Sequence, residues 1–120
     1  MKSSTEIKKI AKETIALEAE EIKRLERAIN DNFVKVIDLI LNAKGRLIVA
    51  GIGKSANIAN KMVATFNSTG QPAVFLHAAD AIHGDLGNIQ KEDVVICISK
   101  SGNTPEIKAL LPFIKNMGNA

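Results

Sequence analysis

Three hydroxyl side chains lie close together in the segment Ser99-Lys-Ser-Gly-Asn-Thr104, directly after an apolar run. Pro105 follows, and proline suits the first helical position because its missing N–H would lack an intrahelical partner there, so Thr104 is a predicted N-cap. Hydroxyls, free backbone N–H groups and the positive end of a helix dipole together supply the donors that a phosphate dianion needs. Gly102 would let the backbone approach the anion closely. The segment therefore predicts a phosphate site, and the alternative is an ordinary polar loop with a good helix cap.

A second polar segment, Gly51-Ile-Gly-Lys-Ser55, also follows an apolar run. Its two glycines allow a sharp turn from a strand into a helix, and Lys54 and Ser55 would project from the carboxyl edge of a sheet. Ligands bind open α/β sheets at that edge. We therefore expect this turn and the hydroxyl-rich turn to open on the same edge.

The Gly51–Ser55 segment matches two nucleotide-binding motifs only in part. With Ala56 it satisfies the loose dinucleotide pattern G-x-G-x-x-A, but that fingerprint expects an acid near the end of the second strand, where Leu76 and His77 stand. Its Gly-Lys-Ser ending also occurs in the P-loop, which needs a glycine where Ile48 stands. The sequence disfavours an NAD site and excludes a P-loop.

The segment from His77 to Gly87 contains two histidines and two aspartates. Such a set could hold a metal, but loop spacing fixes no coordination geometry, and we assign no metal site. A catalytic histidine is a more attractive role, since imidazole moves protons near neutral pH. For His77 and Asp80, hydrogen bonding and capping within a loop is an equal alternative. Glu106 also has a structural alternative, because acids suit the dipole in the first turn of a helix.

Apolar periodicity predicts helices alternating with strands. Residues 3–29 predict one long helix, and a second helix follows that Gly45 would end. The predicted helices cover residues 3–29, 33–41, 56–67 and the stretch from Pro105 onward, and the predicted strands cover residues 46–50, 72–76 and 94–98. The apolar run 94–98 is typical of a parallel strand covered on both faces, and residues 77–88 are predicted to be a loop with a turn of helix. This order predicts an α/β fold with a parallel sheet.

The composition excludes several classes of protein. At 120 residues the chain allows one domain, and its net charge of +3 is small, with basic residues interleaved with acids. We see neither a basic patch with stacking aromatics for nucleic acid nor an apolar run that could span a bilayer or form a signal peptide. The single cysteine, Cys97, lies in an apolar run and fits a reducing compartment. We expect a cytoplasmic protein without a nucleic-acid or membrane partner.

The polar segments together resemble sugar isomerase (SIS) domains, and among these the arabinose-5-phosphate isomerases of the KpsF/GutQ type. The resemblance is carried by Gly51-Ile-Gly-Lys-Ser55, Ser68-Thr-Gly70, His83-Gly-Asp-Leu-Gly87 and Ser99-Lys-Ser-Gly-Asn-Thr104. It implies a three-layer α/β/α sandwich with a parallel sheet, in which helices over residues 1–44 precede the N-terminal portion of a SIS domain over residues 45–120. It also implies interconversion of D-ribulose 5-phosphate and D-arabinose 5-phosphate for Kdo synthesis, in lipopolysaccharide or capsule formation, with no cofactor.

The family's site residues carry over to matching positions of this sequence. The resemblance implies phosphate or substrate binding by eight residues, which are Gly53, Ser55, His77, Ser99, Lys100, Ser101, Gly102 and Thr104. It implies catalytic roles for Lys54, His83 and Glu106, with Lys54 managing charge on an enediolate and with acid and base roles open between the other two. Lys100 stands where these isomerases commonly have Asn, so it adds a cation beside the phosphate.

The resemblance also concerns the surroundings of the site. The family domain continues for several more strands and helices, so we expect this sequence to be incomplete at its C-terminus and to turn over little by itself. A homotetramer is implied, and the narrow apolar stripe of the helix over 3–29 is typical of a helix that packs on another subunit. The alternatives are a non-catalytic SIS module that senses a sugar phosphate, a site for a Kdo nucleotide in the same pocket, and a structural half-domain that a partner chain completes.

Overall fold

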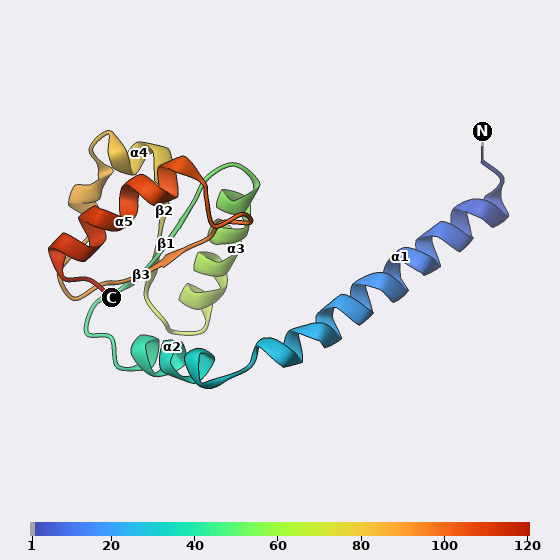
Figure 1. Cartoon of the computed structure of the whole chain (residues 1–120), viewed down its shortest axis with the longest axis horizontal. Helices are drawn as coiled ribbons and strands as arrows, with labels where there is room; N and C mark the ends of the chain where they lie inside the picture. Colours follow the sequence, from blue (N-terminus) through green and yellow to red (C-terminus); the bar gives the residue numbers. More distant parts are fainter. Residues whose placement is uncertain (1) are drawn as a thin grey trace. The chain divides into compact units, whose positions relative to one another are not determined.

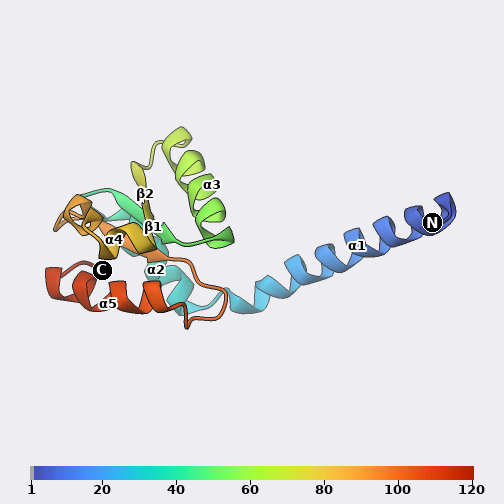
Figure 2. The same ribbon diagram turned by 90° about the horizontal axis from the view of Figure 1, so that it is seen from above.

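The computed structural model describes residues 2–120 and contains two compact units, one up to Ile37 and one from Asp38 to Ala120. The first unit holds α1 (Ser4–Arg24), the 3₁₀ helix η1 (Leu25–Ala28) and the beginning of α2 (Asp31–Leu41). The second unit holds the sheet and the remaining helices, as Figure 1 and Figure 2 show. The domain boundary that we place between residues 44 and 45 stays a prediction.

The N-terminal helix is shorter than its predicted span of residues 3–29. Ser3 caps α1, since its hydroxyl oxygen accepts a hydrogen bond from the Glu6 N–H (3.2 Å). Regular helix ends at Arg24, a 3₁₀ turn follows, and Ile29 has extended backbone angles. No residue of α1 is buried. Within residues 2–120, none of the helices combines the length and the hydropathy needed to cross a bilayer.

The second helix begins two residues before its predicted span of residues 33–41 and ends at the last residue of that span. Asn30 caps α2, because its Oδ1 accepts from the N–H of Asn32 (2.9 Å). The helix ends at Leu41, so the expectation that Gly45 ends it is wrong. Gly45 instead lies against the backbone of Glu92, where an added Cβ would be 2.6 Å from the carbonyl carbon. A close backbone approach, rather than a helix end, requires glycine there.

Three parallel strands form one sheet in the order β2-β1-β3. They are β1 (Leu47–Gly51), β2 (Ala73–His77) and β3 (Val94–Cys97). Every residue of β1 is buried, whereas most of β3 is half-buried. The prediction of a strand covered on both faces therefore fits the central strand β1, while β3 is an edge strand of the described sheet and is less completely covered.

Helices cover both faces of the sheet, which confirms the α/β/α architecture. They are α3 (Lys54–Ser68), α4 (Ala78–Ile82), the 3₁₀ helix η2 (Asp85–Asn88) and α5 (Pro105–Met117). Successive side chains of β1 point to opposite faces, so Leu47 and Val49 join the cluster under α3 while Ile48 and Ala50 join the cluster under α4 and α5. Figure 1 shows α3 on one side of the sheet and α4 and α5 on the other. The predicted loop over residues 77–88 contains more helix than expected.

A buried ion pair fixes the entrance to two strands. Asp93 is 2% exposed, and its Oδ2 lies 2.7 Å from Nη2 of Arg46. Its carboxylate also accepts from the backbone N–H groups of Arg46 (2.7 Å) and Gln90 (2.9 Å). Burial alone would raise the pKa of Asp93, but these hydrogen bonds and the guanidinium charge outweigh it and hold the pKa below its usual value. The pair ties the start of β1 to the start of β3.

Candidate functional site

Strand register brings the three polar segments to one edge of the sheet. Gly51 pairs with His77 and Ala50 pairs with Cys97, so the three strands end at nearly the same level. The Ile98 N–H donates to the Ala50 carbonyl (2.9 Å) and extends this pairing beyond β3. Ligands of open α/β sheets bind outside the carboxyl ends of the strands. The expectation that the glycine turn and the hydroxyl-rich turn share this edge is confirmed.

The hydroxyl-rich turn is held in shape by its own side chains. Ser99 Oγ and Thr104 Oγ1 share a hydrogen bond of 2.8 Å, and Ser99 Oγ also accepts from the Gly102 N–H (3.0 Å). Ser101 Oγ accepts from the Asn103 N–H (3.1 Å). Gly102 has φ = +70°, a conformation that glycine adopts without steric cost. The turn is therefore preformed, with Ser101 exposed at its outer side.

Thr104 stands at the N-cap position of α5 but does not cap the helix with its side chain as predicted. Its hydroxyl is bonded to Ser99, and no cap hydrogen bond from its side chain is formed. The helix begins at Pro105, and the Thr104 carbonyl accepts from the Lys108 N–H (2.9 Å). The first-turn N–H groups of this helix of 13 residues are thus left without a side-chain cap. These N–H groups point out of the N-terminus of α5, where the helix dipole stabilises an anion.

The two glycines of the first turn are required for different reasons. A Cβ on Gly51 would lie 2.9 Å from the carbonyl carbon of Ser55, so the first turn of α3 packs against the end of β1. Gly53 has φ = +59° with open space around it, so its backbone conformation and not its packing favours glycine. This turn places Lys54 at the start of α3, exposed to solvent, and leaves Ser55 half-buried.

His77 ends β2 beside a small cavity. The cavity of about 190 Å³ is also lined by Asp80, Asp85 and Asn88. His77 Nδ1 lies 3.6 Å from Asp80 Oδ2, which is too long for a hydrogen bond, and this buried nitrogen has no hydrogen-bond partner within residues 2–120. The sequence analysis missed Asn88, since an isolated amide in a loop carries no signal of its own.

The three predicted catalytic residues lie on three elements that meet this edge. Lys54 is in the first turn of α3, His83 follows the end of α4 and is exposed, and Glu106 is half-buried in the first turn of α5. Within residues 2–120, the side-chain contacts at this edge join Ser99 to Thr104 and His77 to Asp80, and none joins the three catalytic candidates to one another. No hydrogen bond or ion pair within residues 2–120 joins the three, and their meeting at one catalytic centre stays a prediction.

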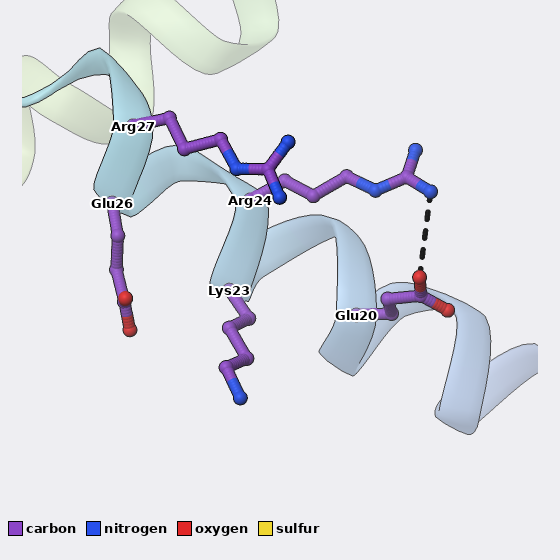
Figure 3. Close-up of a pocket in the computed structure, with 5 residues that line it drawn as sticks. All are labelled: Glu20, Lys23, Arg24, Glu26 and Arg27. Carbon is purple, nitrogen blue, oxygen red and sulfur yellow. Dashed lines mark hydrogen bonds and ion pairs between the residues drawn. The ribbon is translucent and has the colours of Figure 1, made fainter.

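Other chemistry-bearing residues give no competing site in the described part of the chain. Across residues 2–120, no three His, Cys, Asp or Glu side chains are grouped closely enough to hold a metal ion. Burial raises the pKa of the Cys97 thiol, which makes it a poor nucleophile. Figure 3 shows a hollow lined by charged side chains of α1 and η1, among them Glu20, Lys23 and Arg24. None of these five lining residues belongs to the polar segments of the sheet edge.

Comparisons with known proteins agree with this arrangement. Residues 39–120 match the model of the SIS domain. The chain is 49% identical over 111 residues to a Haemophilus influenzae protein named probable arabinose 5-phosphate isomerase, an alignment covering 92% of this chain and 33% of that protein. It is 49% identical over 108 residues to arabinose 5-phosphate isomerase KdsD of Pseudomonas aeruginosa, covering 90% of this chain and 33% of the relative. The chain thus spans about a third of the length of these curated relatives.

Two solved structures share the fold over almost the whole chain. A structure from Escherichia coli in complex with arabinose 5-phosphate is 40% identical with a TM-score of 0.92, and the match covers 98% of this chain and 63% of that one. A structure from Listeria monocytogenes is also 40% identical, with a TM-score of 0.94 and coverage of 100% and 63%. The elements that position the polar segments therefore occur in the same arrangement in both neighbours.

Proposed function

The chain belongs to the SIS domain family, and from that premise we propose that it forms the phosphate-binding part of a sugar-phosphate aldose–ketose isomerase that interconverts D-arabinose 5-phosphate and D-ribulose 5-phosphate. The observation that carries the proposal is the preformed turn from Ser99 to Thr104 at the uncapped start of α5. The names of the curated relatives and the ligand of the Escherichia coli neighbour support the choice of substrate. The pathway served would be Kdo synthesis, in the cytoplasm.

The phosphate group of the substrate would bind in this turn. The reacting carbons are at the other end of the sugar. Ser99, Ser101 and Thr104 offer hydroxyls, and the first-turn N–H groups of α5 offer backbone donors with the positive end of the helix dipole. Lys100 is exposed in the same turn and adds a positive charge. Holding the phosphate in this way positions the reacting carbons and supplies binding energy for the chemical step. Ser55, Gly53 and His77 would contribute from the two neighbouring segments.

The isomerisation moves a proton between adjacent carbons through an enediol. A base must remove a proton from one carbon, and an acid must return it to the other while the oxygens exchange their protons. We assign His83 and Glu106 to these acid–base steps and Lys54 to stabilising negative charge on the enediolate oxygens. Because no hydrogen bond or ion pair within residues 2–120 joins these side chains, we expect substrate, further chain or a second subunit to complete their arrangement. A homotetramer and feedback binding of a Kdo nucleotide at the same edge belong to the same proposal.

A coupled isomerase assay with arabinose 5-phosphate tests the proposal. We would measure this chain and the same chain extended at its C-terminus by the remaining sequence of the Haemophilus influenzae relative. Ribulose 5-phosphate should form with the extended protein, and Lys54→Ala should abolish its formation. If neither protein isomerises the sugar phosphate while both bind it, the alternative of a non-catalytic sensing module replaces the enzyme. If neither binds it, the phosphate site itself is refuted.

A further inference from the structure

The outer edge of β2 is a strand edge without a neighbouring strand. In the order β2-β1-β3, β1 pairs with one side of β2, and no strand within residues 2–120 pairs with the other. The Leu47 N–H donates to the Pro72 carbonyl (2.8 Å), so the even-numbered residues of this stretch direct their backbone groups towards β1. The backbone groups of Ala73, Phe75 and His77 therefore face outward.

Both ends of this outer edge are already occupied. The Asn67 side chain takes the place of a neighbouring strand beside Ala73, because its Oδ1 accepts from the Ala73 N–H (2.8 Å) and its Nδ2 donates to the Ala73 carbonyl (3.0 Å). At the other end, His77 precedes α4, so its carbonyl accepts the first hydrogen bond of that helix. The N–H and carbonyl of Phe75 and the N–H of His77 are left, and within residues 2–120 none of them has a hydrogen-bond partner.

The cavity of about 190 Å³ beside His77 lies along this unoccupied stretch. It is lined by the three consecutive residues from Val74 to Leu76, whose side chains alternate between the two faces of the sheet, so the cavity runs along the backbone edge itself. Its other wall comes from the segment after β2 and includes Asp80, Asp85 and Asn88. The cavity has the volume of about six water molecules, which is room for one long side chain.

The side chains of this cavity offer hydrogen-bond acceptors and negative charge. Asp80 and Asp85 are exposed, and neither forms an ion pair with a lysine or an arginine within residues 2–120. The buried Nδ1 of His77 has no hydrogen-bond partner in that part of the chain. A planar guanidinium carries five N–H donors and a positive charge, so it matches several acceptors better than the compact ammonium group of a lysine does. Charge complementarity therefore selects an arginine.

The register of an added antiparallel segment would bring an arginine to these acids. One residue of the segment would exchange both hydrogen bonds with Phe75, and the residue two positions before it would accept from the His77 N–H. The residue between them would lie opposite Leu76 and on the same face of the sheet. Leu76 belongs to the cluster under α4 and α5, and Figure 1 shows α4 beside the end of β2. The middle residue of three is therefore the one on the side of Asp80 and Asp85.

We propose that the outer edge of β2 is a docking site for a separate protein, which adds a short antiparallel strand of three residues with an arginine in the middle. Hydrogen bonds to the backbone of Phe75 and His77 hold the segment, and the arginine gives selectivity. The segment is not supplied by a second copy of residues 2–120, whose arginines lie in α1 and η1 or, at Arg46, pair with Asp93. The docking site does not depend on the proposed isomerase activity, because the turn from Ser99 to Thr104 takes no part in it.

Titration of the complete chain with a synthetic peptide, followed by NMR of the backbone amides, tests the proposal. The probe is a capped tripeptide of valine, arginine and valine, because β-branched residues favour an extended strand. The amide protons of Phe75 and His77 should shift as the peptide is added, more than that of Leu76, which already bonds to β1. If no shift occurs at Phe75 and His77 up to about 10 mM peptide, the docking site is refuted.

Two altered peptides separate strand addition from simple charge attraction. N-methylation of the second valine removes the N–H that would donate to the Phe75 carbonyl, and it should abolish the shifts at Phe75 and His77. Glutamine in place of the arginine keeps the backbone but removes the charge, and it should raise the dissociation constant about tenfold. Equal binding of the N-methylated peptide would show that charge alone holds the segment, which would contradict the added strand.

Substitutions in the chain test the acids of the cavity. Asp80→Asn combined with Asp85→Asn removes both charges at nearly constant shape and should raise the dissociation constant of the arginine peptide about tenfold. Glu92→Gln removes an exposed acid at the opposite end of the strands and should leave that constant within about twofold. Equal effects of the two variants would overturn the assigned site. If the Phe75 amide shifts with protein concentration in the absence of peptide, a second copy covers the edge and the proposal fails as well.

Discussion

Replacing Asp93 by Asn should destabilise the protein strongly, although it changes few atoms. The carboxylate accepts four hydrogen bonds, three of them from Arg46 and one from Gln90. An asparagine side chain has only one oxygen, so in either orientation its NH₂ group would face donors that now point at a carboxylate oxygen. The charge-assisted bond between Arg46 Nη2 and Oδ2 (2.7 Å) would lose its negative partner. The change therefore leaves a buried polar group badly matched.

The size of the effect follows from these contacts. Losing one charge-assisted hydrogen bond and leaving a buried donor unmatched would together cost about 3 to 5 kcal/mol. The Arg46 side chain is 35% exposed and would be partly rehydrated, which reduces the cost to about 3 kcal/mol. Urea unfolding followed by circular dichroism at pH 7 would measure it. Glu92→Gln is the matched control, because this neighbouring side chain is exposed, and its effect should stay within about 0.5 kcal/mol.

The pH dependence of this difference provides an independent check. The folded-state pKa of Asp93 is lowered, so the stability it contributes is fully present above the unfolded pKa of about 3.9 and is lost as the pH falls through the folded value. The difference in free energy of unfolding between the wild-type protein and Asp93→Asn should therefore become smaller as the pH falls below about 4. A difference under about 1 kcal/mol at pH 7, or a gap that widens in acid, would refute the reasoning.

Three further substitutions test other parts of the structure. Gly45→Ala should destabilise the protein by about 2 kcal/mol because its Cβ would lie 2.6 Å from the Glu92 backbone, whereas Gly87→Ala, with nothing within 4 Å, should be nearly neutral in thermal unfolding. In the extended isomerase, Ser101→Ala should raise KM about tenfold by removing one phosphate hydrogen bond, and an unchanged KM would remove Ser101 from the site. His83→Ala in the same protein should lower kcat by about 100-fold or more while phosphate affinity survives, and a kcat within a few-fold of the original would end its acid–base role.

The strand pattern could be predicted from the sequence because it rests on local signals. Continuous apolar runs and glycine or proline at the turns located β1, β2 and β3 within one or two residues. The same signals placed the polar turns at the carboxyl ends of the strands. Because parallel strands share an edge, the meeting of these turns followed from the order of the elements alone.

What the sequence could not show depends on contacts between distant residues. Nothing local marks Gly45, since the Glu92 backbone that requires a glycine is 47 positions further along the chain. Thr104 looks like a cap because its type and position are right, yet Ser99 takes its hydroxyl. The ion pair between Asp93 and Arg46 was likewise not predicted, because the two residues are far apart in the sequence. The only local signal for it is that an acid stands directly before an apolar strand. The arrangement of Lys54, His83 and Glu106 stays a prediction.

The short segment before β3 has a consequence for how the protein opens. The side-chain amide of Asn119 donates to the carbonyls of Gln90 (2.7 Å) and Asp93 (2.8 Å), while the Gly45 N–H donates to the Glu92 carbonyl (3.0 Å). Residues 90–93 are thus fastened to the start of β1 and to the end of the chain at once. Amide hydrogens that are bonded in this region should exchange with deuterium at a single shared rate. Removing any one of these hydrogen bonds by substitution should raise that rate for all of them. Residues 90–93, the start of β1 and the segment around Asn119 would therefore open together, as one cooperative unit.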